Sequence, residues 1–170
     1  MVRLQTAVET DVDLPARDQR LTQAFVEGSI MDLSAEEARA RLAAARVARL
    51  ATVGRNGHPH LVPVTFAFWD DTIAIAVDHK PKRTLELERL RNVRADPRVT
   101  VLADHYEEEW SRLWWVRADG LARVIDEGQE RREPIRRLRD KYPQYQEREP
   151  AGPVILIQVR SIKGWAYRAG

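Results

Sequence analysis

The sequence contains no cysteine, which excludes disulfide bonds and thiolate chemistry. It also lacks an apolar run long enough to span a membrane, and its N-terminus has neither the cationic nor the apolar part of a signal peptide. Lysine is scarce beside arginine, and a net charge of +2 is small for a nucleic-acid-binding protein. We therefore expect a cytoplasmic protein that binds neither membranes nor nucleic acid.

The remaining composition is that of one folded domain with an extension. The 170 residues are 44% hydrophobic and 32% charged, which is typical of a globular protein large enough for a real core. Residues 1–30 have no sustained hydrophobic period apart from a weak helical pattern over 15–28. We expect 1–30 to be a loosely packed or flexible extension and 31–170 to be a cofactor-binding domain.

The hydrophobic pattern predicts a mainly β protein with six strands and a few flanking helices. A capping box from Ser34 to Glu37 predicts a helix that ends near Ala45. Further helices are predicted over 85–93 and 127–141, and strands over 47–53, 58–68, 72–77, 99–104, 113–125 and 154–161. Because most connections look like hairpins, including a turn at Gly54–Gly57, we expect a closed antiparallel barrel.

The second of these strands contains a proline. Pro63 cannot donate a hydrogen bond to a neighbouring strand. The strand over 58–68 should therefore lie at a sheet edge or bulge at this residue.

A basic turn follows the third strand and precedes a helix. It consists of Asp78, His79, Lys80, Pro81, Lys82, Arg83 and Thr84. Three cations and a hydroxyl at a helix start are what a phosphate group needs, because the free N–H groups and the positive end of the helix dipole lie there. Thr84 could cap the helix or donate its hydroxyl to the phosphate. The alternative is a solvated surface turn.

Three stretches together resemble the split barrels of the pyridoxamine 5'-phosphate oxidase-like, FMN-binding superfamily. They are the strand His60–Phe66, the basic turn, and the region from Asp104 to Gly120. More narrowly, these stretches resemble an actinobacterial subgroup thought to use the deazaflavin coenzyme F420. The resemblance covers 31–170, and it implies a six-stranded Greek-key split β-barrel, a homodimer, and two cofactor sites at the subunit interface.

The resemblance also implies which residues bind the cofactor. The basic turn would hold the phosphate through Lys80, Lys82, Arg83 and Thr84, with Asp78 beside them. The second predicted strand would line the ring system, partly by backbone groups, at His60, Val62, Pro63, Val64 and Thr65. Aromatic residues such as Trp114, Trp115 or Trp165, from the same chain or from the partner chain, would wall the pocket. Since neighbours on a strand face opposite ways, only one of Trp114 and Trp115 can face the ligand.

The resemblance implies an oxidoreductase that transfers a hydride from reduced F420 to a small unsaturated or conjugated organic substrate. Such a transfer depends on close placement more than on a catalytic side chain, so none is assigned. Candidate proton donors are His60, His79, His105 and Tyr106. The alternatives are an FMN-dependent oxidoreductase and a non-catalytic protein that binds a flavin or haem.

A metal site is an alternative role for the histidines. His58 and His60 are two residues apart on a predicted strand, a spacing that can chelate a metal. No cysteine or glutamate cluster supplies further ligands, and a third histidine would have to come from elsewhere in the chain. We therefore expect no metal.

Overall fold

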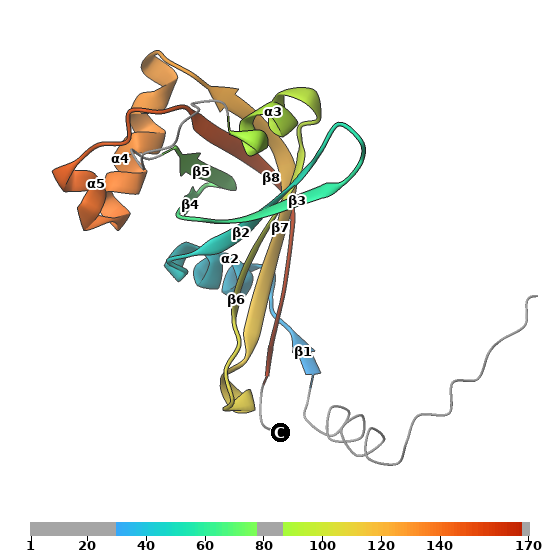
Figure 1. The fold of residues 1–170 in the computed structure, drawn as a ribbon. Helices are drawn as coiled ribbons and strands as arrows, with labels where there is room; N and C mark the ends of the chain where they lie inside the picture. The colour runs from blue at the N-terminus through green and yellow to red at the C-terminus, as the bar shows by residue number, and fades with distance from the viewer. Residues whose placement is uncertain (1–29, 78–86, 168–170) are drawn as a thin grey trace, which may run out of the picture.

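The computed structural model describes residues 30–77 and 87–167. Two longer helices and several short ones flank one antiparallel sheet (Figure 1). The elements are β1 (Ile30–Asp32), α2 (Ala35–Ala44), β2 (Ala48–Val53), β3 (Pro59–Val64), β4 (Ala67–Trp69), β5 (Thr72–Ala76), α3 (Glu88–Ala95), β6 (Arg98–His105), η1 (Trp110–Arg112), β7 (Trp114–Ile125), η2 (Gln129–Arg131), α4 (Arg132–Lys141), α5 (Pro143–Glu147) and β8 (Val154–Tyr167).

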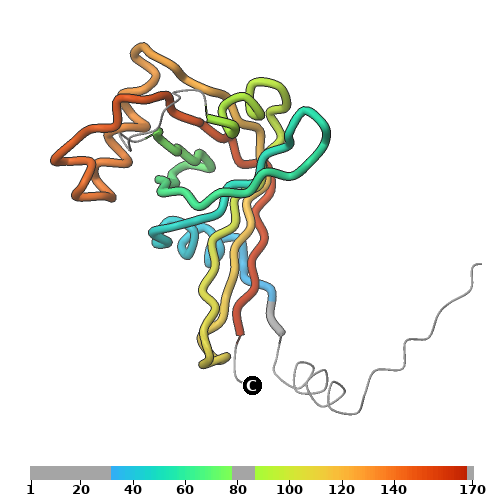
Figure 2. Tube along the Cα trace, viewed as in Figure 1, coloured from blue at the N-terminus to red at the C-terminus, as the bar shows by residue number. Residues whose placement is uncertain are grey.

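The sheet has the strand order β3-β2-β6-β7-β8-β5-β4, and β1 pairs with β8 outside this path. Its two outermost strands, β3 and β4, are consecutive in sequence and are separated only by Thr65 and Phe66. The chain therefore passes from one sheet edge to the other in two residues, which curls the sheet into a split barrel. The long strands β6, β7 and β8 lie side by side and extend well beyond the rest of the sheet (Figure 2).

The local signals near the start of the domain are confirmed. The Ser34 hydroxyl accepts a hydrogen bond from the backbone N–H of Glu37 at 3.2 Å, and the Glu37 carboxylate accepts one from the Ser34 N–H at 2.9 Å. This capping box starts α2, which buries Ala38 and Leu42. The Gly54–Gly57 turn joins β2 to β3, and Gly57 takes a φ of +80°, which glycine adopts without strain.

Two groups of buried side chains stabilise the fold. The main core lies between α2, α3 and the sheet, and β2 contributes alternate residues to it, as a half-buried strand should. A second, smaller core lies where α4 and α5 cover β4 and β5. Its members include Ala74, Ile135, Leu138 and Tyr142.

Several predicted elements are wrong in extent. The prediction of six strands fails because the strand over 58–68 divides into β3 and β4 and because β1 was missed. The strand over 154–161 continues to Tyr167, since it pairs with β7 and β1 along this length. The helix over 127–141 begins only with η2, and the loop that follows it contains α5. The edge position of Pro63 is confirmed, because β3 is an outermost strand.

The part of the chain that the structure describes contains no helix that is both long enough and apolar enough to cross a membrane.

Candidate functional site

The strand predicted to line the ring system, β3, pairs only with β2 among the described residues. A hydrogen bond of 2.8 Å from the Gly54 N–H to the His58 carbonyl shows which residues of β3 direct their backbone groups toward β2. Alternate residues of an antiparallel strand direct their backbone groups to the neighbouring strand, so His60, Val62 and Val64 bond to β2. Leu61 and Pro63 direct theirs away from the sheet. Pro63 thus loses no ladder hydrogen bond.

The side chains of β3 alternate between an exposed face and a face that packs on the core. Val64 is buried in the main core and Val62 packs against it, whereas Pro63 is exposed and Leu61 is 64% exposed. The outer edge of β3 therefore offers the N–H and carbonyl of Leu61 and the carbonyl of Pro63 beside apolar side chains. These unpaired backbone groups are available to a ligand or to another chain.

Two tyrosines from the far end of the domain hold the link between β3 and β4. The hydroxyl groups of Thr65 and Tyr145 lie 2.8 Å apart. The Tyr142 hydroxyl accepts from the Phe66 N–H at 3.1 Å and lies 2.9 Å from the Phe66 carbonyl and 2.8 Å from that of Arg46, to which it can donate. Burial raises the pKa of Tyr142, so this hydroxyl keeps its proton. These contacts fix the position of Thr65, one of the predicted ring-lining residues.

His60 is the outermost of three polar side chains that contact one another in series and lead into the main core. Its Nδ1 lies 3.4 Å from the Thr52 hydroxyl, which accepts a hydrogen bond from the Asn92 side-chain amide at 3.0 Å. Thr52 and Asn92 are the two buried polar residues among those that the structure describes. His60 is half-buried and is the member of this series nearest the surface. The imidazole is therefore held in place, which a proton donor or a ring contact requires.

The other candidate proton donors lie elsewhere. His105 is at the far end of β6 and has its Nε2 2.9 Å from the Glu107 carboxylate. Tyr106 is 64% exposed beside it. His79 lies outside the described residues. The described residues contain no group of three or more potential metal ligands.

The basic turn also lies outside the described residues, and with it Asp78, Lys80, Lys82, Arg83 and Thr84. Its flanks are the predicted ones, β5 before it and a helix after it. That helix, α3, begins at Glu88 and has Leu87 at its N-cap, so the prediction that Thr84 caps it is wrong.

The three tryptophans predicted to wall the pocket, Trp114, Trp115 and Trp165, do not all lie on one face of the long strands. Trp114 packs against the main core, with the Arg41 guanidinium 5.4 Å from its ring centroid. Trp115 is its neighbour on the strand and so faces the other side, where it is opposite Trp165 on β8. Within one chain β7 lies three strand positions from β3, which is about 14 Å at the usual strand spacing. One chain therefore does not bring these tryptophans to the edge of β3.

One cavity of the described chain lies outside the predicted ring site. It measures about 520 Å³ and lies over β2, β6 and β7, beside a register shift between Asp119 and Gly120. None of the predicted cofactor residues lines it. The ring site predicted from the sequence is thus an open strand edge in the single chain.

A family model described as pyridoxamine 5'-phosphate oxidase matches residues 34–166. The chain belongs to the pyridoxamine 5'-phosphate oxidase family. No curated protein gives a sequence match. The family match covers nearly the whole described domain and agrees with the split-barrel fold.

Solved structures share the fold of this pyridoxamine 5'-phosphate oxidase family member. A conserved hypothetical protein from Mycobacterium tuberculosis matches with a TM-score of 0.65 and 23% identity over 82% of this chain and 88% of its own. An FAD-binding protein from Mesorhizobium loti has a TM-score of 0.63 and 23% identity, over 82% and 99%. A heme-binding protein from Mycobacterium smegmatis has a TM-score of 0.61 and 23% identity, over 77% and 52%.

Sequence reasoning about this family member missed Tyr142, Tyr145 and Asn92. The two tyrosines lay in a region predicted to be a loop, and their partners on the β3–β4 link are about eighty residues earlier in the chain. Asn92 interrupts the apolar face of α3 and is fully buried. A polar residue at an inward position of an amphipathic helix was the one available signal.

Proposed function

We propose that this protein is an oxidoreductase that transfers a hydride from reduced coenzyme F420 to a small unsaturated or conjugated organic substrate. The observation that carries the proposal is the open outer edge of β3, in a chain whose family match spans this strand. The sequence resemblance supplies the choice of the deazaflavin. The neighbours described as FAD-binding and heme-binding support a ring-shaped ligand in this fold.

The residues fit such a ligand. The unpaired backbone groups of Leu61 and Pro63 offer hydrogen bonds to polar ring atoms, and the two tyrosines keep the adjacent Thr65 in position. Lys80, Lys82 and Arg83 would hold the phosphate as charge-assisted donors. When bound, the deazaflavin supplies the hydride. His60, fixed by Thr52, is the side chain that we assign to hold or donate a proton at its imidazole.

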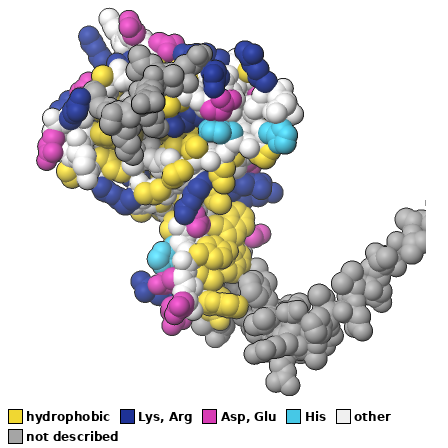
Figure 3. All heavy atoms as spheres, viewed as in Figure 1, with side chains coloured by type: hydrophobic (Ala, Val, Ile, Leu, Met, Phe, Trp, Pro, Cys, Tyr) yellow, Lys and Arg dark blue, Asp and Glu magenta, His cyan; other side chains and the backbone are white. Residues whose placement is uncertain are grey.

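We further propose that the working unit is a cytoplasmic homodimer with the cofactor at the subunit interface. The tryptophans on β7 and β8 lie too far from β3 within one chain to wall the same pocket. Figure 3 shows hydrophobic side chains gathered on the lower part of the sheet, where the long strands extend. A partner that covers this surface would bring Trp115 or Trp165 to the site.

Two alternatives use the same site. An FMN-dependent oxidoreductase would need the same phosphate anchor and ring contacts. A non-catalytic flavin or haem carrier would bind the ring without turnover. The FAD-binding and heme-binding neighbours favour keeping both in the test.

The test is a spectroscopic titration with F420, FMN and haem. Wild type should bind F420 most tightly, and replacing Lys80, Lys82 and Arg83 by alanine should weaken that binding by at least about a hundredfold. The melting temperature of the ligand-free protein should not change. Unchanged F420 affinity in the triple variant would remove the basic turn from the site. Tightest binding of FMN, or of haem without turnover, would select one of the two alternatives.

A further inference from the structure

Another cavity, of about 390 Å³, lies beside the start of α4, and none of the proposed cofactor residues lines it. Its lining, which we call the arginine cavity, consists of Gly128, Arg131, Arg132, Ile135, Arg136, Arg139 and Glu149. Positions 132, 135, 136 and 139 follow the spacing of one helix face. Four guanidinium groups thus surround a space with one carboxylate.

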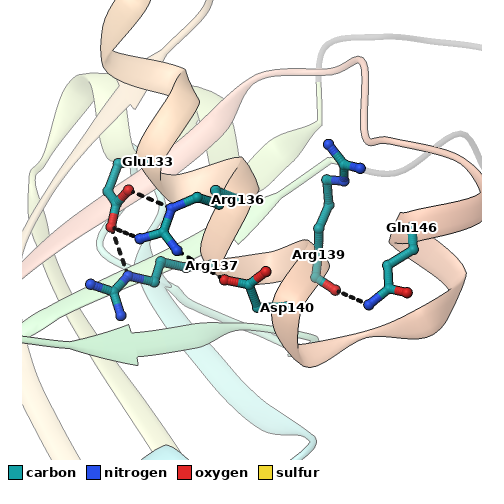
Figure 4. A network of polar contacts seen from close by, with 6 residues as sticks. All are labelled: Glu133, Arg136, Arg137, Arg139, Asp140 and Gln146. Carbon is teal, nitrogen blue, oxygen red and sulfur yellow. Dashed lines mark hydrogen bonds and ion pairs between the residues drawn. The ribbon is translucent and has the colours of Figure 1, made fainter.

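Two of these four charges are already compensated. Arg136 forms hydrogen bonds of 2.6 and 2.9 Å with the Glu133 carboxylate and one of 3.0 Å with Asp140. Figure 4 shows this network and shows the Arg139 side chain extending away from it. Arg139 pairs instead with Glu149 at 3.1 Å.

The other two charges have no carboxylate partner among the described residues. Arg131 donates through Nη2 to the carbonyl groups of Pro150 and Gly152, at 3.1 and 2.8 Å, and its Nε is buried without an acceptor. The Arg132 side chain is exposed and makes no hydrogen bond or ion pair within the described chain. A buried N–H of a charged group without an acceptor is unfavourable, and the single carboxylate of the lining, Glu149, already pairs with Arg139.

We propose that the arginine cavity binds the phosphate or pyrophosphate group of a small organic molecule. The planar guanidinium group matches two phosphate oxygens at once, which a halide or a single hydroxyl cannot satisfy. The ten-residue helix α4 adds the positive end of its dipole at Arg132. Buried Ile135 supplies an apolar wall for the organic part of the ligand.

The place of the cavity in the fold allows two sources for this phosphate. Gly152 accepts from Arg131, and the next residue, Pro153, accepts from the Val77 N–H at 3.0 Å. Val77 directly precedes the basic turn in the sequence. The phosphate could therefore belong to the tail of the proposed cofactor or to a separate metabolite. The site itself does not depend on the proposed function.

The first experiment uses calorimetric titration of the full chain with inorganic pyrophosphate. Wild type should bind one pyrophosphate per chain, and Arg132→Gln should weaken binding by roughly tenfold. We expect this variant to keep the fold, because the exposed Arg132 side chain has no hydrogen bond or ion pair within the described chain to lose. Arg148→Gln is the matched control, since Arg148 is exposed nearby, carries the same charge and does not line the cavity. It should bind like wild type.

Three outcomes would overturn the proposal. They are no saturable binding by wild type, equal weakening in both variants, and binding that survives Arg132→Gln but is lost on replacing Lys80, Lys82 and Arg83. The last outcome would assign the pyrophosphate to the basic turn. Conversely, a triple variant that still binds pyrophosphate supports the arginine cavity even if the proposed cofactor fails to bind.

Comparison of FAD, which has a pyrophosphate, with FMN, which has a single phosphate, distinguishes the two sources. A cofactor tail in the cavity predicts that Arg132→Gln weakens FAD binding more than FMN binding. A separate metabolite predicts that neither flavin is affected and that pyrophosphate still binds the flavin-loaded protein. Both results support an anion site here, and they assign it to different ligands.

Discussion

The ammonium nitrogen of Lys141 lies 4.1 Å from the centroid of the Phe66 ring, so the last residue of α4 contacts the link between β3 and β4. This nitrogen is buried and has no hydrogen-bond acceptor among the described residues. Burial lowers the pKa of Lys141 to about 8, and the positive charge of Arg46 acts in the same direction. The attraction of the ring for the cation therefore does not offset the loss of water.

This contact predicts a change of stability at alkaline pH. Between about pH 8 and 10.5 the folded chain has lost the Lys141 proton while the unfolded chain still holds it, so stability contributed by this group rises with pH. Lys141→Met should lack that rise and be at least as stable as wild type at pH 7. Urea unfolding from pH 7 to 10.5 measures both. The same rise in the variant would assign the effect to another group.

The hydrogen bonds of the Tyr142 hydroxyl predict how much the β3–β4 link contributes to the free energy of unfolding. Tyr142→Phe would leave the Phe66 N–H and nearby carbonyl groups without this partner in a buried place, at a cost of about 1–3 kcal/mol in unfolding free energy. Tyr106→Phe is the control, because Tyr106 is exposed and forms no hydrogen bond within the described chain. A similarly small loss in both variants would show that water replaces the hydroxyl.

The same link shows what the sequence could and could not predict. Signals completed within a few residues, such as the Ser34–Glu37 capping box and the Gly54–Gly57 turn, predicted their elements correctly. The alternating pattern over 58–68 contained no break, yet the strand ends at Val64. Tyr142 and Tyr145 bind the two residues at this break, and these contacts arise only from the tertiary fold.

The candidate site was predictable to a similar degree. Proline at position 63 predicted an edge strand, and the edge is where unpaired backbone groups are available. The alternation of Trp114 and Trp115 between faces also followed from strand geometry. The sequence pattern did not reveal how far the tryptophans lie from β3, because strand order is set by pairing between distant segments.

The distance between the tryptophans and β3 within one chain leads us to predict a dimer. The protein should be a homodimer at micromolar concentration, with an interface burying well over about 2,000 Å², as in obligate dimers. Multi-angle light scattering measures the mass directly. A monomer at this concentration would contradict both the dimer and the shared cofactor site.

A shortened chain that begins at residue 30 tests the role of the preceding extension. Such a chain keeps β1, which pairs with β8 from Ile30 to Asp32, whereas a start at Met31 would remove part of this strand. We expect it to bind F420 with wild-type affinity, as measured by fluorescence titration. Loss of affinity would mean that residues 1–29 form part of the site.

Strand β8 pairs with β1, β5 and β7, although it is the last strand in the sequence. During translation, the earlier strands β1 and β5 therefore leave the ribosome before the strand that joins them to β7 has been made. The sheet cannot close until residues 154–167 emerge, so until then apolar strand edges are exposed to chaperones and to other nascent chains. The topology thus delays closure of the sheet until this strand is available.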